Sequence, residues 1–405
     1  MYLLPKPKTI KEQDGQMLLC HSTHIVMTKE VAETEMHAAK RLQEAIRQET
    51  GLILPFSVGE VREGDLSLGI AKTLPEQTYE ITIDEKGGQI SGGDGAGVLY
   101  GVETFCQIVQ QCGGILPCVQ IQDAPDMPNR GYYFDQTRGR VLKLEELKKI
   151  ADRMCRYKLN QLQLYVEHTY LFRDFSEMWR DQTPLTAEEI LELDSYCRER
   201  HIELVPSLAS FGHLCTLLST KTYGDLCEME DSWKEPFSFW NRMRYHTINV
   251  SDERSLPLIK KMIAEYMQLF SSNKFNICAD ETFCLGKYKS KKLAEERGVH
   301  RLYIDYVKEL AQFLVENGKI PMFWGDIIWN SPELMKELPE SMICLNWGYA
   351  PEQREDETRA IAQTGAVQYL CPGVCGWNQW ANLIENSYKN ITRMCGYAAK
   401  YHGIG

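Results

Sequence analysis

The sequence predicts an α/β protein: a (β/α)8 barrel, or TIM barrel, whose last βα unit is truncated, preceded by a small α+β domain. Three observations lead to this prediction. The chain has 405 residues, which suits a barrel of about 250 residues plus a smaller partner domain. After residue 126, strand-like and helix-like segments alternate seven times, and this alternation predicts parallel strands with right-handed crossovers. The closing residues HGIG look like the start of one more strand.

Residues 1–125 form the predicted small domain. YEITIDEKGGQIS reads as two strands around a Gly-Gly turn, and a helix follows with Val102, Phe105 and Val109 at helical spacing. The intervening GGDGAG imitates a dinucleotide-binding loop, but its strand belongs to a hairpin and does not open a βαβ unit. We therefore interpret it as a tight turn before a packing helix. A second, amphipathic helix is expected over residues 30–49.

Residues 126–405 form the predicted barrel domain. The two prolines of DAPDMPNR (123–130) interrupt both the strand-like and the helix-like spacing of apolar residues, which indicates a domain boundary. The alternative architecture is an open, doubly wound sheet. Thr186 with Glu189 predicts a capping box at the start of one helix. The expected strands are residues 130–136, 160–166, 202–208, 274–280, 320–326, 342–348 and 366–373, and the expected helices are 144–157, 186–201, 254–270, 292–317, 331–338, 354–364 and 381–400.

Composition excludes several function classes. A net charge of −11 leaves no basic footprint for nucleic acid. No apolar run approaches the roughly 20 residues that a membrane helix needs, and no signal peptide is visible, so we expect a cytoplasmic protein without a membrane partner. The 14 cysteines are scattered through apolar segments, which predicts reduced core thiols. Neither CPGVC nor HSTH has metal-site spacing, so no metal or other cofactor is expected.

Acids, histidines and tryptophans collect at the predicted carboxyl ends of the strands, where a barrel carries its active site. A lone acid after a strand is more often a helix cap, and a lone tryptophan more often core, but their convergence is hard to obtain from packing alone. Tryptophan suits the apolar C–H faces of a sugar and acids suit its hydroxyls, so carbohydrate is the expected ligand class. These residues are Asp135, Glu167, His168, His213, Asp280, Glu281, Trp324, Asp326, Trp347 and Trp377.

The stretch KFNICADETF delivers two adjacent acids, Asp280 and Glu281. Ordinary glycosidases use two carboxyl groups about 5–9 Å apart across the scissile bond. Adjacent strand residues point to opposite faces, so these acids are badly placed for that task. They suit a different arrangement, in which Glu281 protonates the leaving oxygen and an ionised Asp280 holds a C2 acetamido group of the substrate that attacks C1.

Several motifs in a fixed order resemble the family 20 glycoside hydrolases, the β-N-acetylhexosaminidases, and within them the hexosaminidase D-like branch. They are GVLYGVETFCQ, RGYYFDQTR, KLNQLQLYVEH, PSLASFGH, NICADETFCLG, FWGD and CPGVCGW. The resemblance covers nearly the whole chain, with two departures: SFGH replaces the family's Pro-Gly-His, and YVEH replaces a strand that ends in acids.

The resemblance implies an exo-acting, retaining enzyme that removes terminal β-linked GlcNAc or GalNAc by substrate-assisted catalysis through an oxazolinium intermediate. It implies Glu281 as general acid/base and Asp280 as the residue that orients the acetamide. Arg130 would grip the ring hydroxyls, because a guanidinium fork suits that role. The full set of expected substrate-binding residues is Arg130, Glu167, His213, Trp324, Asp326, Trp347 and Trp377.

Three alternatives stay open at this point. One is a galactosaminidase or glucosaminidase acting on free amino sugars, in which Asp280 pairs with the ammonium group. Another is a catalytically silent sugar-binding relative, although a binding protein has no need for a protonatable acid at Glu281. The third is a barrel enzyme of another reaction class. The sequence does not choose between GlcNAc and GalNAc, and it does not give an oligomeric state.

Overall fold

A computed structural model describes residues 1–236, 238–377 and 379–405. The chain divides into two units, which we describe separately: the first comprises Met1–Arg130, Glu145–Asn160 and Ser195–Ile202, and the second comprises Gly131–Leu144, Gln161–Asp194 and Glu203–Gly405. In the described part of the chain, every helix is too short or too polar to cross a bilayer.

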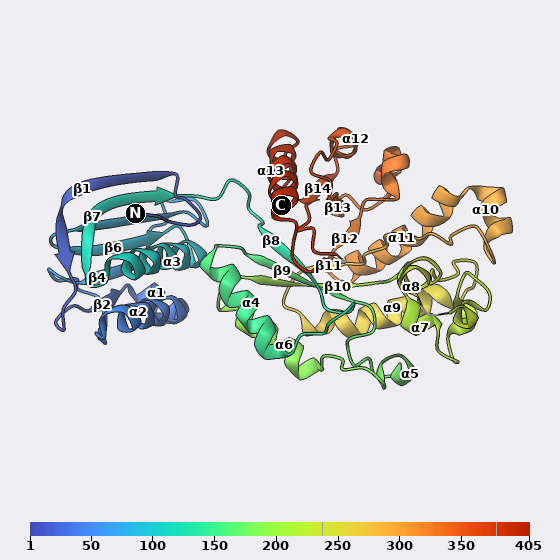
Figure 1. The fold of residues 1–405 in the computed structure, drawn as a ribbon, viewed down its shortest axis with the longest axis horizontal. Coiled ribbons are helices and arrows are strands. Elements are labelled where there is room, and N and C mark those ends of the chain that lie inside the picture. The colour runs from blue at the N-terminus through green and yellow to red at the C-terminus, as the bar shows by residue number, and fades with distance from the viewer. Residues whose placement is uncertain (237, 378) are drawn as a thin grey trace. The chain divides into compact units, whose positions relative to one another are not determined.

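The first unit contains a mixed seven-stranded sheet in the order β1-β7-β5-β6-β4-β2-β3, with helices on one of its faces (Figure 1). The strands are β1 (Thr9–Leu18), β2 (Ile25–Met27), β3 (Phe56–Val58), β4 (Leu66–Ile70), β5 (Tyr79–Asp84), β6 (Gly87–Gly92) and β7 (Ile115–Asp123), and the helices are α1 (Lys29–Thr34), α2 (Met36–Thr50) and α3 (Gly95–Cys112). The predicted α+β domain thus has both of its expected helical regions.

The GGDGAG segment is a turn into a packing helix, as the sequence predicts. Strands β5 and β6 pair antiparallel up to Asp84 and Gly87, which gives the predicted hairpin. Asp94 caps α3, because its Oδ1 accepts from the backbone N–H of Gly97 at 2.7 Å. A Cβ at Gly93 would lie 1.9 Å from the carbonyl oxygen of Pro75, so a close backbone approach requires glycine here.

The helix expected over residues 30–49 is two helices. Thr28 caps α1, whose backbone leaves helical geometry at Glu35 with φ −120° and ψ 28°, and α2 starts at the next residue. The Glu35 carboxylate reaches the imidazole of His201 at 2.8 Å within the same unit. Amphipathic spacing continues across this break, and therefore periodicity alone could not locate it.

The second unit contains a curled, all-parallel sheet in the order β14-β13-β12-β11-β10-β9-β8. All seven predicted strands are present, in register from Gly131 with Gln161 at one edge to Trp347 with Cys371 at the other. They are β8 (Gly131–Asp135), β9 (Gln161–Val166), β10 (Glu203–Leu208), β11 (Lys274–Asn276), β12 (Ile320–Trp324), β13 (Ile343–Trp347) and β14 (Val367–Cys371).

Helices alternate with these strands along the chain. The capping box forms, since Thr186 Oγ1 accepts from the backbone N–H of Glu189 and the Glu189 carboxylate accepts from that of Thr186. The α-helices are α4 (Leu144–Arg156), α5 (Ser176–Trp179), α6 (Ala187–Arg198), α7 (Cys215–Leu218), α8 (Phe239–Arg244), α9 (Ser255–Tyr266), α10 (Lys291–Arg297), α11 (Val299–Glu316), α12 (Asp356–Gln363) and α13 (Ile384–Lys400), and the short 3-10 turns are η1 (Gly224–Leu226), η2 (Ser232–Lys234), η3 (Met267–Leu269), η4 (Ile328–Asn330) and η5 (Pro332–Glu337). Of these helices, α4 from Glu145 onward and the end of α6 from Ser195 onward belong to the first unit.

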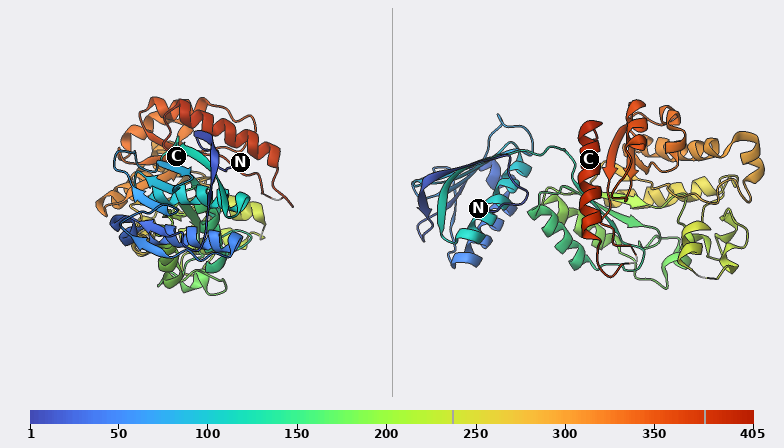
Figure 2. Two further views of the ribbon diagram at one scale, coloured as in Figure 1. Left: turned by 90° about the vertical axis from the view of Figure 1, so that its left-hand side faces the viewer. Right: turned by 45° about the horizontal axis from the view of Figure 1, so that its top comes forward.

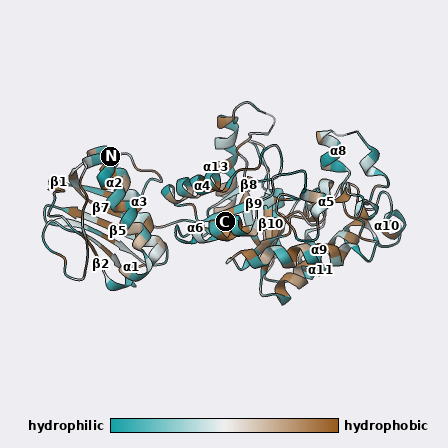
Figure 3. Cartoon of the chain, turned by 90° about the horizontal axis from the view of Figure 1, so that it is seen from below, coloured by the Kyte–Doolittle hydropathy of each residue, from teal (hydrophilic) through white to brown (hydrophobic). Residues whose placement is uncertain are grey.

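Two of these helices differ from expectation. Residues 292–317 are split into α10 and α11, because Gly298 takes φ 87°, a conformation that favours glycine. Residues 331–338 form the 3-10 turn η5. The helices α9 and α11 show both hydrophobic and hydrophilic patches (Figure 3), and α11 buries Leu302, Val307 and Leu310.

The C-terminal residues are bonded to the edge strand β14, and Figure 2 marks the C-terminus in two further views. The backbone N–H of Ile404 donates to the carbonyl of Gln368 at 3.1 Å, and the N–H of Leu370 donates to the carbonyl of Gly405 at 2.9 Å. Both bonds join the C-terminal backbone to β14, although residues 403–405 do not take up a regular strand. HGIG therefore lies where a further strand would pair with β14, as expected from the sequence.

Candidate active site

The loop that carries Asp280 and Glu281 is not a continuation of the strand. Strand β11 ends at Asn276, and Cys278, Ala279 and Glu281 have positive φ angles of 58°, 64° and 49°. The left-handed region costs about 1–2 kcal/mol for each residue with a Cβ, so the surrounding structure must hold this backbone in place. The expectation that strand alternation turns the two acids to opposite faces is therefore wrong, because the alternation stops four residues before Asp280.

Three side chains hold this strained loop. The Asn276 carboxamide oxygen accepts from the backbone N–H of Cys278 at 2.8 Å. The hydroxyls of Ser210 and Tyr303 donate to the carbonyls of Ile277 and Ala279 at 2.6 and 3.0 Å. Since all these donors and acceptors are buried, breaking one leaves an unpaired polar group, and this fixes the loop without regular strand pairing.

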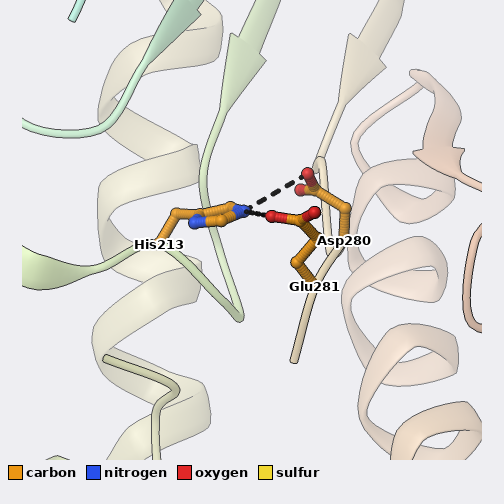
Figure 4. Close-up of side chains that lie close together, drawn as sticks. All are labelled: His213, Asp280 and Glu281. Carbon is orange, nitrogen blue, oxygen red and sulfur yellow. Dashed lines mark ion pairs between the residues drawn. The ribbon is translucent and has the colours of Figure 1, made fainter. Parts of the chain in front are cut away.

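Both acids turn toward one imidazole (Figure 4). The Nε2 atom of His213 lies 3.4 Å from Oδ2 of Asp280 and 3.2 Å from Oε2 of Glu281. His213 is buried, and it follows Gly212, where a Cβ would meet the carbonyl oxygen of Asp280 at 2.5 Å. The glycine in SFGH therefore lets two loops touch, and that contact places the imidazole against both carboxylates.

Charge around this imidazole sets the protonation of the cluster. Burial alone would lower the pKa of His213, but the neighbouring Asp280, Glu281 and Glu167 carboxylates raise it to about 10. Burial acts against ionised Asp280 too, yet His213 and then Arg138 hold the pKa of Asp280 below its usual value. At neutral pH the arrangement is thus an imidazolium bound to an ionised aspartate, with Glu281 beside them.

Asp326 is a third acid at this place. Its Oδ2 accepts from the backbone N–H of Glu281 at 3.0 Å. Burial, and then the charges of Asp280 and Glu281, raise the pKa of Asp326 to about 8, so this carboxyl group is largely neutral at neutral pH. The structure therefore brings Asp326, predicted from its place after a strand, to the backbone of the predicted general acid.

Glu167 lies just after β9 and is fully enclosed by polar partners. Its Oε1 accepts from the Tyr165 hydroxyl at 2.9 Å and lies 4.0 Å from Nε of Arg138, while its Oε2 accepts from Nη2 of Arg242 at 3.0 Å. The charge of Glu167 contributes to the raised pKa of His213. Glu167 thus acts on the site through its charge and through the network that it forms with Arg138 and Arg242.

Arg130 is not at this site. It precedes the first residue of β8, at the amino end of the strand, whereas the acids lie beyond carboxyl ends. Its guanidinium donates to the carbonyls of Met127 and Lys158 and to the Tyr100 hydroxyl. These donors are therefore occupied within the first unit, and the expectation that Arg130 grips a sugar needs correction.

Arg138 is the arginine at the carboxyl end of β8. Its Nε donates to Oδ2 of Asp135 at 2.7 Å, and its guanidinium lies over the Tyr165 ring at 4.7 Å. Burial opposes the charge, but Tyr165, Asp135, Glu167 and Asp280 together raise the pKa of Arg138. Sequence reasoning missed it, although RGYYFDQTR contains both arginines and only the second follows the strand.

The predicted tryptophans form two aromatic groups. Trp324 is buried and packs edge-on against Tyr133 with ring centroids 4.9 Å apart. Trp347 stacks on Tyr349 at 4.9 Å, and Tyr349 in turn contacts Trp377 at 4.4 Å. A Cβ at Gly373 would lie 2.6 Å from both the Tyr349 and Trp377 rings, so this glycine permits their approach.

Tyr349 was missed by sequence reasoning and links the aromatic group to the acids. It follows β13 and is 39% exposed. Its exposed surface is not at the hydroxyl. Burial of that group, followed by the charge of Asp280, raises the pKa of the hydroxyl, and Glu281 adds to the effect. Its position two residues after Trp347, at a strand end, was the available signal.

The three residues of Figure 4 are also compact enough to hold a cation, since one potential ligand atom from each lies within 4.8 Å of the others. A histidine ligand must be neutral to offer a lone pair. The two carboxylates instead raise the pKa of His213 to about 10, which favours the protonated ring. This donor set therefore fits a shared proton better than a metal ion.

Comparison with known proteins identifies the family. Residues 1–124 match the profile of "Glycosyl hydrolase family 20, domain 2", and residues 128–401 match that of "Glycosyl hydrolase family 20, catalytic domain". The chain belongs to glycosyl hydrolase family 20. The resemblance of the sequence motifs to family 20 is thereby confirmed at the level of the family.

Proteins named as hexosaminidases resemble this chain in sequence and in fold. The chain is 24% identical over 411 residues to a β-hexosaminidase of Porphyromonas gingivalis, covering 92% of this chain and 50% of that protein. The β-N-acetylhexosaminidase of Bacteroides fragilis superposes with a TM-score of 0.75 at 18% identity, covering 94% of this chain and 78% of the other. A Streptomyces plicatus β-hexosaminidase mutant in complex with its product GlcNAc superposes with a TM-score of 0.75 at 19% identity. The match covers 91% of this chain and 74% of the other. The chain spans about half the length of the P. gingivalis relative.

Proposed function

We propose that this family 20 protein is an exo-acting, retaining β-N-acetylhexosaminidase that removes terminal β-linked GlcNAc or GalNAc with assistance from the substrate. One observation carries the proposal: a single imidazole nitrogen, Nε2 of His213, lies within 3.4 Å of both Asp280 and Glu281. Two acids held on one side by one cation can serve different roles, but they cannot flank a bond.

The separation of the acids supports this choice. Glycosidases with an enzyme nucleophile place their carboxyl groups about 5–5.5 Å apart on opposite sides of the sugar, and inverting enzymes place them about 6.5–9.5 Å apart. Here both acids turn toward the same imidazole nitrogen, so they lie on one side and do not face each other across a sugar. The attacking group must therefore come from elsewhere, and a C2 acetamido group is the nearest oxygen nucleophile on an amino sugar.

The steps follow from the two acids. Glu281 gives its proton to the glycosidic oxygen while the acetamide carbonyl oxygen attacks C1, and the C1–O bond to the leaving group breaks. Asp280 accepts the acetamide N–H and balances the positive charge of the oxazolinium ring. Glu281 then takes a proton from a water that attacks C1 from the leaving-group side, which restores the acetamide and retains the configuration.

Other residues supply binding and orientation. His213 keeps Asp280 ionised, and Asp326 fixes the backbone of Glu281 through one hydrogen bond. We assign Arg138, in place of Arg130, to the hydroxyls of the terminal sugar, and Trp324, Trp347, Tyr349 and Trp377 to the walls around its acetamide. An acetylated sugar is further supported by the S. plicatus relative, which was crystallised with GlcNAc as product.

The experiment compares aryl β-glycosides of N-acetylglucosamine, N-acetylgalactosamine and their free amino forms. We expect turnover of the acetylated substrates, inhibition by a thiazoline analogue of the intermediate, and a roughly 10²- to 10⁴-fold lower kcat for Glu281→Gln. Turnover confined to the free amino sugars would support an aminosugar hydrolase instead. Calorimetric binding of GlcNAc without any turnover would support a silent sugar-binding protein.

A further inference from the structure

One face of the central strand β9 is polar, although the strand is buried on both sides. Gln161, Gln163 and Tyr165 alternate with Leu162 and Leu164, and all five are buried. A parallel strand that is covered on both faces normally carries apolar residues throughout, and branched aliphatic side chains usually fill a barrel interior. A glutamine in such a place loses its hydration, so it is tolerated only where its amide group finds hydrogen-bond partners.

The carboxamides of Asn276, Gln163 and Gln161 form one hydrogen-bonded amide chain. Nδ2 of Asn276 donates to Oε1 of Gln163 at 3.1 Å, and Nε2 of Gln163 donates to Oε1 of Gln161 at 3.2 Å. Nε2 of Gln161 donates to Oε2 of Glu203 at 3.0 Å and to the hydroxyl of Tyr369, on the far edge strand β14, at 3.4 Å. The amide chain therefore runs through the interior of the curled sheet, from β11 through β9 to β10.

The two ends of the amide chain have opposite chemistry. At one end, Oδ1 of Asn276 accepts from the backbone N–H of Cys278 at 2.8 Å. At the other end, Glu203 accepts from Nζ of Lys274 at 2.6 Å and from the Ser272 hydroxyl at 2.6 Å. Burial opposes the charge of Glu203, but the bonds from Lys274 and Ser272 lower its pKa, so this carboxylate is ionised at neutral pH.

These ends permit one orientation of the three amides between them. A backbone N–H can only donate, and an ionised carboxylate can only accept. Each carboxamide must therefore turn its oxygen toward Cys278 and its nitrogen toward Glu203. Reversing one of them would set N–H against N–H, or oxygen against oxygen, in a buried place, and both groups would then lose their hydrogen bonds.

The orientation of Asn276 is important because of the loop that it holds. Its oxygen supports Cys278, whose φ is 58°, and Asp280 follows two residues later. A residue with a side chain keeps such a left-handed backbone only while its surroundings hold it. An Asn276 amide with its nitrogen turned to this N–H would release the loop that carries Asp280 and Glu281.

We propose that Gln163 and Glu203 are positioning residues for the two acids, and that they act through the orientation of Asn276. This inference rests on the proposed function, in which Glu281 protonates the glycosidic oxygen. Proton transfer from a general acid depends on its distance and angle to the accepting oxygen, so a small displacement of the loop lowers the rate of that step. The amino-end carboxylate of Glu203 thus contributes to chemistry at the carboxyl ends of the strands.

The test uses the leaving group to report on the general acid. A 4-nitrophenyl β-N-acetylglucosaminide departs with little help from a proton, whereas the phenyl glycoside depends on it. Gln163→Met keeps the length of the side chain but interrupts the amide chain. We expect kcat to fall roughly tenfold for the phenyl glycoside and less than about threefold for the 4-nitrophenyl glycoside, with KM changed less than about twofold. A smaller folded fraction alone would lower kcat equally for both substrates.

Asn276→Asp provides a rescue. A carboxyl group at this position has an acceptor oxygen for the Cys278 N–H whichever way it turns. Gln163→Met added to Asn276→Asp should therefore change the ratio of the two kcat values by less than about twofold relative to Asn276→Asp alone. A full tenfold change in the double variant would show that Gln163 does not act through Asn276, and would overturn the proposal.

Glu203→Gln tests the amino end of the barrel, because a carboxamide there no longer fixes the direction of the amide chain. We expect the kcat ratio to shift in the same direction as in Gln163→Met, by about threefold. Gln368→Met is the matched control, since Gln368 is a buried glutamine on β14 whose Nε2 donates to the carbonyl of Thr358 on α12. It should leave the kcat ratio within about twofold of wild type.

An unchanged kcat ratio in folded Gln163→Met, or an equal loss for both glycosides, would contradict the proposal. A wild-type ratio in Glu203→Gln would contradict it too, and this variant decides alone if Gln163→Met does not fold. If wild type cleaves neither glycoside, the hydrolase proposal itself fails. If wild type cleaves both and the variants keep its ratio, the hydrolase proposal stands and only the role of Gln163 and Glu203 is lost.

Discussion

Two buried groups of charges in this molecule follow opposite rules. In the N-terminal unit, Nε of Arg41 meets Oε1 of Glu103 at 2.9 Å, so one cation serves one acid. In the catalytic unit, Asp280 and Glu281 share the single imidazole of His213, and Asp326 contacts the Glu281 backbone. A paired charge is satisfied by the fold, whereas a crowded group of acids stays ready to exchange a proton or to bind a polar substrate.

The largest effect on catalysis is expected when one of the crowded acids loses its charge. Asp280→Asn keeps the shape of the side chain but removes the charge that would accept the acetamide N–H and balance the oxazolinium ring. We expect kcat for an aryl β-N-acetylglucosaminide to fall roughly 10²- to 10³-fold in the folded variant, in which His213 keeps Glu281 as a partner. Asp225→Asn, which changes an exposed acid paired with Arg254, is the control and should leave kcat unaltered.

Removing one charge of the Arg41–Glu103 pair should lower the stability of the protein without changing its turnover. Glu103→Gln leaves the largely buried Arg41 without its counter-charge, and we expect the free energy of unfolding to fall by about 3 kcal/mol. Urea unfolding measures this change, and kcat of the folded protein should stay the same. The control is Glu44→Gln in the exposed pair with Arg47, which should change stability little. A large loss of kcat in folded Glu103→Gln would contradict the contrast between the two groups.

A smaller effect is expected in how the stability of the protein depends on pH. The pKa of Asp326 is raised to about 8, against about 4 in an unfolded chain. Between these values the native state holds a proton that the unfolded chain has released, so this group makes stability fall as pH rises from about 4 to 8. Asp326→Asn should flatten that fall, while its carboxamide oxygen can still accept from the Glu281 N–H.

The measurement is urea unfolding of wild type and Asp326→Asn from pH 4.5 to 8.5. His213, whose raised pKa makes stability fall between about pH 6.5 and 10, is present in both proteins, and therefore the difference between the two curves reports Asp326. Parallel curves would show that the Asp326 carboxyl is ionised in the native state, contrary to the crowded arrangement.

The architecture was predictable because it depends on patterns that the sequence repeats. Apolar runs separated by helical stripes located all seven parallel strands, and the Thr186–Glu189 capping box was visible as two residues at the right spacing. Helix interruptions were less visible. The breaks at Glu35 and Gly298 leave the amphipathic period nearly intact, so only backbone geometry reveals them.

The sequence located several of the residues that the structure brings together near Asp280 and Glu281, but it did not give their geometry. Strand ends located Glu167, Asp326 and the tryptophans, whereas Arg130 was chosen over Arg138 because both lie in one motif, on either side of the same strand. The shared orientation of Asp280 and Glu281 depends on three positive φ angles in residues that usually avoid them. Local preference argues against that conformation, and long-range contacts impose it.

The contact at Gly212 has a consequence for how this protein can change over time. A Cβ at Gly212 would press on the carbonyl of Asp280. The loops after β10 and β11, although about 70 residues apart in the sequence, are therefore expected to be conserved together. A substitution that changes the backbone of one loop requires a compensating change in the other. Variation in substrate preference is then expected to accumulate in neighbouring segments, such as the one that carries α8, while this pair of loops stays fixed.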